Sequence, residues 1–417
     1  MIRGIWQIGK WLLDGTEDRE ATFVENLVED VGYTEKGTPH IVILKICLEP
    51  PSLDLDCVEL SEDKVMNYLW IGNAGSMDDQ DRVTTNRKSP SQDRLEYLIS
   101  QTLPNLLKPG RLPEGELRVL IQKVFDNLYM DLGEKEVVFQ GHGGDQQYPR
   151  YRYLWNLRKM GIRDAPTRDE LIAVTREQGT AKAAIKEVQK FLMEWICDRL
   201  NLRPKDIVLY TLEINGITLA QHKDYRRYIF QRVVGELFED APFGICHICG
   251  ERKRVTDNTK FFKLLKFYNT DKIGFASRLD ERSGFYRTYA LCRDCYMALL
   301  AGETFVRRNL LSNLAYNDVY IIPSFHLPIK LAPERIRDWS EGLRAYVGQL
   351  RSLDEWRKFQ RNVGSVKCFK DFEDTKALFL LNFLFAKKIQ AEMRIQKLVQ
   401  EVPPFRLDTL VLSLIHI

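Results

Sequence analysis

Apolar residues recur every three or four positions in several segments of the chain, as is typical of a helix with one buried face. Near the N terminus these positions are Ile2, Ile5, Ile8 and Leu12. Gly15 follows them and suits a C-cap. Farther along, Thr167 to Glu170 has the sequence of a capping box, and residues 181–200 repeat the helical spacing. We predict a helix at each of these three places.

Other segments have the composition of strands. Pro39 to Leu48 is a continuous apolar run rich in β-branched residues, which favours a buried strand. Residues 207–214 and 217–219 flank Asn215-Gly216, a dipeptide that is a strong signal for a tight hairpin turn. Asp318 to Phe325 predicts a further strand.

Polar stretches with glycine, proline, serine and asparagine predict long loops. Residues 73–93 and 140–149 have this composition, and the pattern of 94–133 is mainly helical. After Ala332 the sequence predicts mostly helix. The longest of these helices is expected over about 374–402, where Pro403-Pro404 ends it.

Length and composition indicate a multidomain globular protein. The chain has 417 residues, 44% of them apolar, which is ordinary for a protein with a substantial core. No run reaches the roughly 18 apolar residues of a membrane span, and the N terminus lacks the features of a signal peptide. We therefore expect a soluble, cytoplasmic protein with reduced cysteines.

The predicted elements indicate an α+β fold with several regions. A mixed α/β N-terminal region comes first, a four-cysteine zinc-binding module is inserted, and a helical C-terminal region follows. The expected boundaries are 1–165 for the N-terminal α+β region, 166–240 for helices plus a β-hairpin, 241–300 for the zinc module and its insert, 301–331 for a strand and linker, and 332–417 for the helical region.

Two C-x-x-C pairs are the most informative chemical feature. Cys246 and Cys249 form the first pair, Cys292 and Cys295 form the second, and 42 residues separate them. Four thiolates in two such turns can hold one zinc ion in a tetrahedral site. Gly250 follows the first pair, where a knuckle favours a residue that tolerates positive φ. We predict a structural zinc ion bound by the four sulfurs.

Other interpretations of the cysteines are weaker. A single C-x-x-C can be a redox pair, but two pairs favour a metal. Catalytic zinc is not favoured, because four thiolates leave no open position for water. His247 lies inside the first pair, yet four sulfurs already complete the shell. The remaining cysteines stand among largely apolar neighbours and are interpreted as small buried side chains: Cys47, Cys57, Cys197 and Cys368.

The segment between the pairs, residues 250–291, is basic and rich in aromatic residues. It carries twice as many basic as acidic residues, whereas the net charge of the whole chain is only +3. Cations neutralise phosphates and aromatic faces stack on exposed bases, so the segment is a candidate site for single-stranded or distorted duplex nucleic acid. The alternative is a solvated basic surface around a small aromatic core. The basic residues are Arg252, Lys253, Arg254, Lys260, Lys263, Lys266, Lys272, Arg278, Arg282 and Arg287.

Asn86, Arg87 and Lys88, in the loop predicted over 73–93, form a second candidate nucleic-acid site. Asparagine and arginine side chains can form the paired hydrogen bonds that read base edges. An ordinary exposed loop is the simpler interpretation of this segment taken alone.

Known catalytic motifs are not recognisable in the sequence. It contains no nucleophile elbow, P-loop or zinc-protease motif, and its six histidines are widely spread. Some nucleases place histidines between paired zinc ligands, but residues 250–291 contain none. We therefore expect a protein without enzymatic activity. A stand-alone zinc-ribbon regulator that binds nucleic acid is an alternative, and a zinc-supported nuclease is a weaker one.

Several blocks resemble one family, in the same order along the chain. They are IWQIGKWLL near the N terminus, LEINGITLAQHKDYRRYIF (212–230), CHICG, FYNTDKIGFASRLDE (267–281), LCRDC and YIIPSF (320–325). Together they resemble the CRISPR-associated large subunit of the type I-B Cascade interference complex (Cas family eight, subtype b; the Csh type).

The resemblance implies a non-catalytic subunit of a crRNA-guided surveillance complex in antiviral defence. Such a subunit lies beside the crRNA and the other Cascade backbone subunits. It recognises the protospacer-adjacent motif in target double-stranded DNA, helps to open the duplex and recruits the helicase–nuclease. The guide reads the sequence, while the protein reads the short motif and the backbone. Because the chain ends in LDTLVLSLIHI, we expect the family's C-terminal helical bundle to be truncated here.

Overall fold

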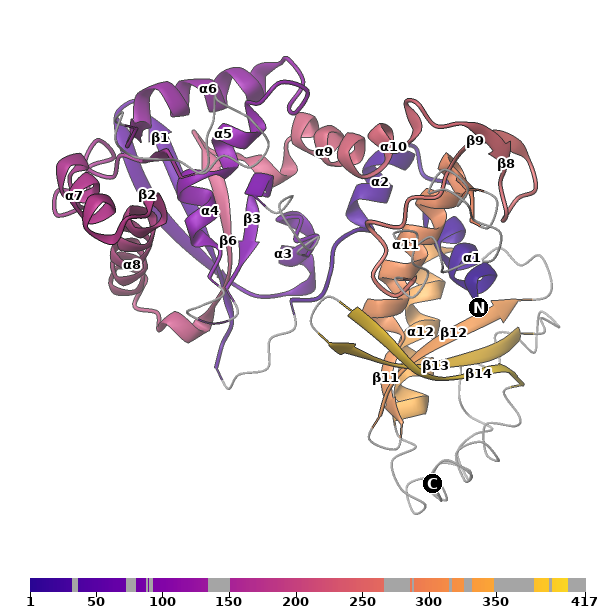
Figure 1. Ribbon diagram of the computed structural model, residues 1–417. Coiled ribbons are helices and arrows are strands. Elements are labelled where there is room, and N and C mark those ends of the chain that lie inside the picture. The colour runs from indigo at the N-terminus through magenta and orange to yellow at the C-terminus, as the bar shows by residue number, and fades with distance from the viewer. Residues whose placement is uncertain are drawn as a thin grey trace. The chain divides into compact units, whose positions relative to one another are not determined.

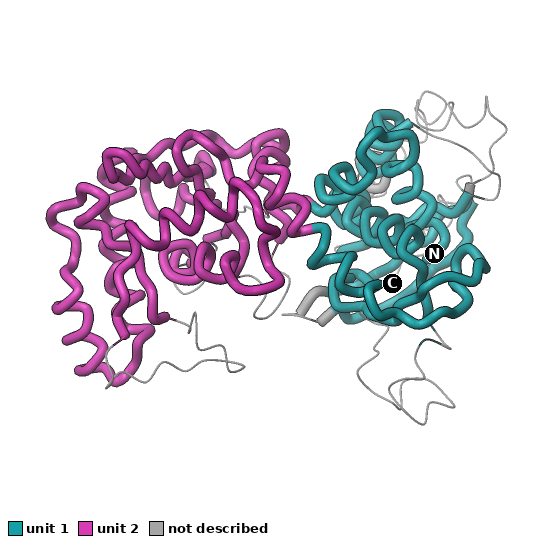
Figure 2. Tube along the Cα trace, turned by 90° about the horizontal axis from the view of Figure 1, so that it is seen from above, with its two compact units in different colours: residues 1–27, 230–417 teal, residues 28–229 magenta. Residues whose placement is uncertain are grey.

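The computed structural model divides the chain into two compact units (Figures 1 and 2). Unit 1 comprises residues 1–27 and 230–417, and unit 2 comprises residues 28–229. The five regions expected from the sequence follow chain order, whereas unit 1 joins the two ends of the chain. The described residues are 1–31, 37–72, 80–87, 89, 93–133, 151–265, 286, 289–314, 317–325, 332–348, 379–389 and 392–403.

Unit 2 is built on a mixed sheet with the strand order β2-β1-β6-β3, and β7 pairs with β6. β1 and β6 run parallel, and the other pairs are antiparallel. The predicted strand over 39–48 and the predicted Asn-Gly hairpin are confirmed, with positive φ at both turn residues. The strands are β1 (His40–Leu48), β2 (Pro51–Glu59), β3 (Thr84–Asn86), β6 (Ile207–Ile214) and β7 (Ile217–Thr218).

Helices and a small hairpin complete unit 2. The capping box at Thr167 and Glu170 opens α7 as predicted, because each residue bonds the backbone N–H of the other. The helix predicted over 181–200 is α8, which packs against α4, α7 and β2. The elements are α3 (Glu62–Asn67), α4 (Leu95–Ser100), α5 (Thr102–Leu106), α6 (Glu116–Leu128), β4 (Tyr129–Asp131), β5 (Tyr153–Trp155), α7 (Arg168–Gln178), α8 (Ala181–Leu200) and α9 (Lys223–Phe230).

The described residues of unit 1 form two sheets, with strand orders β10-β9-β8 and β11-β12-β13-β14. Its strands are β8 (Phe243–Ile245), β9 (Arg252–Thr256), β10 (Leu291–Cys292), β11 (Leu311–Leu314), β12 (Asn317–Phe325), β13 (Phe379–Ile389) and β14 (Glu392–Val402). Its helices are α1 (Ile2–Leu13), α2 (Arg19–Glu25), α10 (Glu236–Phe238), α11 (Arg293–Asn309) and α12 (Pro333–Gly348). In the part of the chain that the structure describes, no helix is long and apolar enough to cross a bilayer.

The N-terminal helix α1 packs closely along α11, as Figure 1 shows. The helices approach through glycine, since a Cβ atom on Gly9 would lie 1.7 Å from the carbonyl oxygen of Ala298. The reciprocal contact is equally tight, because a Cβ on Gly302 would lie 1.9 Å from the carbonyl oxygen of Ile5. Of the predicted apolar face of α1, Ile5, Ile8 and Leu12 are buried, whereas Ile2 is exposed. This contact ties the N terminus to the helix that begins at the second cysteine pair.

The prediction of one long helix over 374–402 is wrong, because residues 379–389 and 392–402 form β13 and β14, an antiparallel pair beside β12. Residues 381–386 of β13 are all buried, so the strand has no polar face and no alternation that would mark it as a strand. Asn382 fits this interior because its amide donates to the oxygens of Ile322 and Ser324, at 2.9 and 2.8 Å. Its own side-chain oxygen accepts from the N–H of Glu401.

Candidate metal centre

The four cysteines are positioned by the small sheet β10-β9-β8 and by helix α11. Cys246 directly follows β8, and the turn to Gly250 closes when the Gly250 N–H donates to the Cys246 oxygen at 2.8 Å. Gly250 has a φ of 75°, as the knuckle pattern predicts. Cys292 ends β10 and precedes α11, whose first turn carries Cys295. A single strand, β9, pairs with both β8 and β10 and so holds the two turns together.

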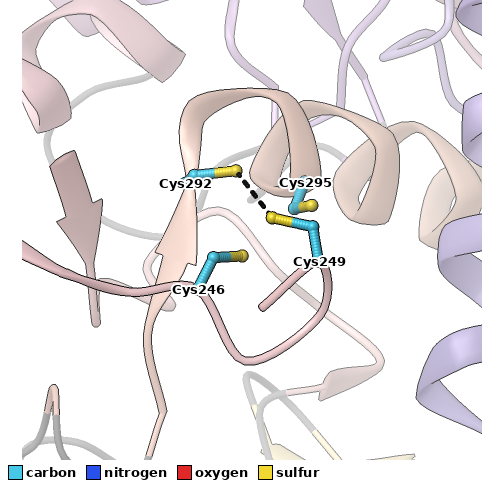
Figure 3. Close-up of side chains that lie close together, drawn as sticks. All are labelled: Cys246, Cys249, Cys292 and Cys295. Carbon is cyan, nitrogen blue, oxygen red and sulfur yellow. Dashed lines mark hydrogen bonds between the residues drawn. The ribbon is translucent and has the colours of Figure 1, made fainter. Parts of the chain in front are cut away.

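The four sulfur atoms converge on one point (Figure 3). All lie within 4.8 Å of one another, and the Sγ atoms of Cys249 and Cys292 are 3.9 Å apart. A tetrahedral zinc ion with Zn–S bonds of about 2.3 Å requires sulfur separations of about 3.8 Å. The predicted cysteine cluster is confirmed, and its geometry fits zinc. His247 is exposed and is not part of the cluster.

The electrostatics of the cluster also favour a cation. Hydrogen bonds from Cys292 and Cys295 lower the pKa of the Cys246 thiol. The hydrogen bond with Cys246 raises the pKa of the Cys292 thiol to about 11, and the same partner raises the pKa of Cys295. The sulfurs therefore resist ionising together, whereas a doubly charged metal ion would stabilise all four thiolates. The N-terminal end of α11 contributes further positive potential at the second pair.

Three other described cysteines are not part of this cluster. Cys47, Cys57 and Cys197 are half-buried rather than fully buried. Burial raises the pKa of the Cys57 and Cys197 thiols, so both favour the neutral form. Cys368 lies outside the described residues.

Three of the predicted basic residues, Arg252, Lys253 and Arg254, lie on β9 and are exposed. Lys253 is paired with Glu251 at 2.5 Å and lies 3.9 Å from a carboxylate oxygen of Asp294. The structure thus places a short basic strand directly beside the metal centre.

The other predicted basic residues of the insert are only partly described. Lys260 is exposed, with its ammonium 5.4 Å from the centre of the Phe261 ring, and Lys263 is half-buried. Phe262 is fully buried and packs edge-on against Tyr296, with ring centres 5.2 Å apart, as expected of an aromatic core. Five predicted residues lie outside the described residues: Lys266, Lys272, Arg278, Arg282 and Arg287.

A buried carboxylate, which the sequence did not single out, anchors the start of the insert to α11. Glu303 is 1% exposed and accepts hydrogen bonds from three consecutive backbone N–H groups. Burial raises the pKa of this carboxyl group, and the backbone donors oppose the shift. The donors belong to Lys263, Leu264 and Leu265. Helix α11 therefore begins directly after Cys292, carries Cys295 in its first turn, and also carries the group that fixes the start of the insert.

Replacing Glu303 with alanine should lower the free energy of unfolding by about 1–3 kcal/mol, because three backbone donors lose their acceptor and two of them are buried. Chemical denaturation followed by circular dichroism measures this loss. Replacing Glu341, an exposed glutamate on α12, with alanine is the control and should change stability little. Equal effects of the two substitutions would contradict the anchoring role.

The structure corrects the expectation of an exposed loop around residues 86 and 87. Asn86 belongs to β3 and is 2% exposed. The Arg87 side chain is 9% exposed, and its Nε donates to Asp93 at 3.1 Å while Nη1 donates to the carbonyl oxygen of Pro204. Both side chains serve the packing of unit 2. Lys88 lies outside the described residues.

Comparison with known families places both parts of the chain in one family. Residues 1–231 match the family model described as the CRISPR-associated protein TM1802 (cas_TM1802) N-terminal domain. Residues 243–402 match the model described as the central domain of the same protein, and this match begins at β8 and includes all four cysteines. No curated protein matches the chain. The first match alone covers more than half of the sequence, so the chain belongs to the CRISPR-associated TM1802 family.

Proposed function

We propose that this protein is the non-catalytic large subunit of a crRNA-guided type I-B Cascade complex in the prokaryotic cytoplasm. In this role it binds beside the crRNA and the other backbone subunits and recognises the protospacer-adjacent motif in double-stranded target DNA. It then helps to open the duplex and recruits the helicase–nuclease. Base pairing with the guide supplies the sequence specificity, and the protein supplies contacts to the motif and the backbone.

The membership of the chain in a CRISPR-associated family, with N-terminal and central domains in order, is the observation that carries this proposal. The metal centre supports it, because four cysteines stabilise a fold that presents the exposed basic residues of β9. A cation-rich surface fits a nucleic-acid partner.

A structural role for the metal supports the non-catalytic assignment. Four thiolates complete a tetrahedral shell, whereas a catalytic zinc ion keeps a position open for water. The proposal therefore expects no cleavage of DNA or RNA by the purified protein in Mg²⁺ or Mn²⁺. Metal-dependent cleavage that is lost with the cysteines would instead favour a zinc-supported nuclease.

Removal of this subunit should abolish motif-dependent target binding. The crRNA-bearing complex is assembled with and without the chain, and binding to a labelled duplex is measured by electrophoretic mobility shift. We expect tight binding only for the complete complex on a duplex that carries both the motif and a sequence matching the guide. A duplex with the matching sequence but a scrambled motif is the control.

Unchanged target binding by the complex that lacks this chain would overturn the proposal. Sequence-preferring duplex binding by the isolated chain, without any association with crRNA-bearing subunits, would favour a stand-alone regulator. Co-purification of the chain with those subunits separates the two outcomes.

A further inference from the structure

The β8–β9 hairpin carries two large apolar side chains in an unusual position. Phe243 is 66% exposed and Ile245 is 62% exposed, the highest values among large apolar residues in the described part of the chain. In the sequence, the two residues are separated only by Gly244, so they alternate as the residues on one face of a strand do. Burial in the core cannot explain these residues, so they call for another role.

The register of the hairpin places these side chains on one face together with two arginines. Phe243 lies opposite Arg254, and Ile245 lies opposite Arg252. Directly opposed residues of an antiparallel pair project to the same side. We call these four residues the outer face of the hairpin, and all four are exposed.

Packing on the opposite side fixes this orientation. Val255 is fully buried, and a Cβ atom on Gly244 would lie 2.7 Å from a methyl carbon of Val255. The hairpin therefore cannot turn over to bury its apolar residues without displacing Val255. Cys246 follows the last residue of β8, so a bound metal would hold the hairpin rigid in this orientation.

On the outer face, the Phe243 ring lies next to the Arg254 guanidinium group, which is fixed by hydrogen bonds to the backbone. The Arg254 guanidinium lies 5.5 Å from the centre of the Phe243 ring. The same group donates to the backbone oxygens of Glu239 and Ala241, at 2.7 and 3.4 Å. Aromatic and guanidinium planes both stack on nucleobases. The contacts of Arg254 therefore organise a stacking surface in advance of binding.

Arg252 gives the outer face a second exposed cationic group. The Arg252 side chain forms no ion pair with any residue in the described part of the chain. Each apolar side chain of the outer face lies opposite an arginine, so apolar and cationic groups stand side by side. The alternation of apolar and cationic groups matches the alternation of bases and phosphates.

The exposed aromatic ring favours a single strand over a duplex. Phe243 can stack on a base only where that base exposes a face, and paired bases inside a continuous duplex cover one another's faces. Bases of a single strand expose their faces and can lie against Phe243 and Ile245.

We propose that the outer face of the β8–β9 hairpin binds unpaired bases of single-stranded nucleic acid, without sequence preference. The proposal rests on the proposed function, in which opening of the target duplex produces such a strand. Beyond that function, it assigns a binding site for single-stranded nucleic acid to four residues: Phe243, Ile245, Arg252 and Arg254.

The test measures binding of the full-length, zinc-loaded chain to a fluorescent oligothymidylate of about 20 nucleotides, longer than the roughly 4–16-nucleotide sites of single-strand binders. Fluorescence anisotropy is recorded over a range of salt concentrations. Phe243→Leu should weaken binding about 5- to 150-fold, because stacking contributes about 1–3 kcal/mol per base. Phe243→Trp should retain binding, since its ring still stacks.

The salt dependence separates stacking from charge. Phe243→Leu should leave the slope of log Kd against log salt unchanged, whereas Arg252→Ala should reduce it by about 0.7, the value for one phosphate on a single strand. Val119→Ala, at a 54% exposed apolar residue of α6, is the matched control and should bind as the unaltered chain does. The zinc content of each variant, measured by mass spectrometry, should remain that of the unaltered chain.

Binding that is unchanged in Phe243→Leu, or no binding of the oligonucleotide by the unaltered chain, would overturn this inference. Unchanged oligonucleotide binding with loss of co-purified Cascade subunits would identify the face as a protein interface and would also overturn it. The outcome is independent of the proposed function: Phe243-dependent binding could coexist with a complex that recognises its target without this chain.

Discussion

Replacing Cys292 with serine should remove the metal and unfold the region around β8, β9 and β10. Cys292 joins β10 to α11, and its sulfur lies 3.9 Å from that of Cys249. A serine hydroxyl is a poor zinc ligand at neutral pH, and the apparent binding free energy of structural zinc, about 10–16 kcal/mol in small domains, is also folding free energy. We expect about one zinc ion per unaltered chain, a stoichiometry that follows from one four-sulfur cluster. We expect almost none in the variant.

Two measurements check this result. Elemental analysis gives the zinc content, and limited proteolysis reports whether the region of residues 243–295 has become accessible. Cys197→Ser is the matched control, because Cys197 is a half-buried thiol of α8 outside the cluster. That variant should keep its zinc. A folded, reduced and zinc-free preparation of the unaltered chain would refute the metal site.

Replacing Gly302 with alanine should destabilise unit 1 by at least about 3 kcal/mol. The added Cβ would lie 1.9 Å from the carbonyl oxygen of Ile5, and backbone atoms on both helices would have to move. The simplest relief is the detachment of α1, which exposes its buried residues, Trp11 among them. Helix propensity alone predicts the opposite sign, because alanine is favoured over glycine in a helix by about 1 kcal/mol.

Denaturation in urea measures the change, and tryptophan fluorescence detects the exposure of Trp11, which packs against Phe325 with ring centres 4.7 Å apart. Gly179→Ala is the control. No atom lies within 4 Å of a Cβ at Gly179, so its cost of about 1 kcal/mol comes only from a positive φ of 66°. A stabilising effect of Gly302→Ala would show that α1 and α11 are not in close contact.

The local features of this protein were predictable from the sequence because short segments specify them. The bounds of α8, the capping box at Thr167 and the turn at Asn215-Gly216 depend on neighbouring residues and fold as expected. The same holds for the metal centre. The C-x-x-C spacing sets each pair of sulfurs in one turn, and two such pairs favour a shared metal, so the clustering of the four cysteines was predictable.

The errors arose where burial, rather than local preference, decided the structure. Residues 381–386 have no polar side that would reveal a strand, and pairing with β12 and β14 selects the strand over a helix. Arg87 has the chemistry of a base-reading residue, yet Asp93 and the Pro204 carbonyl hold it inside unit 2. Neither partner is recognisable from the residues next to Arg87.

The sequence by itself determined the two cysteine pairs of the cluster and the main local helices and turns, because each of these features depends on residues that are close together in the chain. Tertiary structure decided which side chains face solvent. It buried Arg87, made Glu303 the acceptor for the start of the insert, and turned Phe243 and Ile245 outward. Exposure depends on contacts between segments far apart in the chain, such as α1 with α11, and local sequence patterns do not record those contacts.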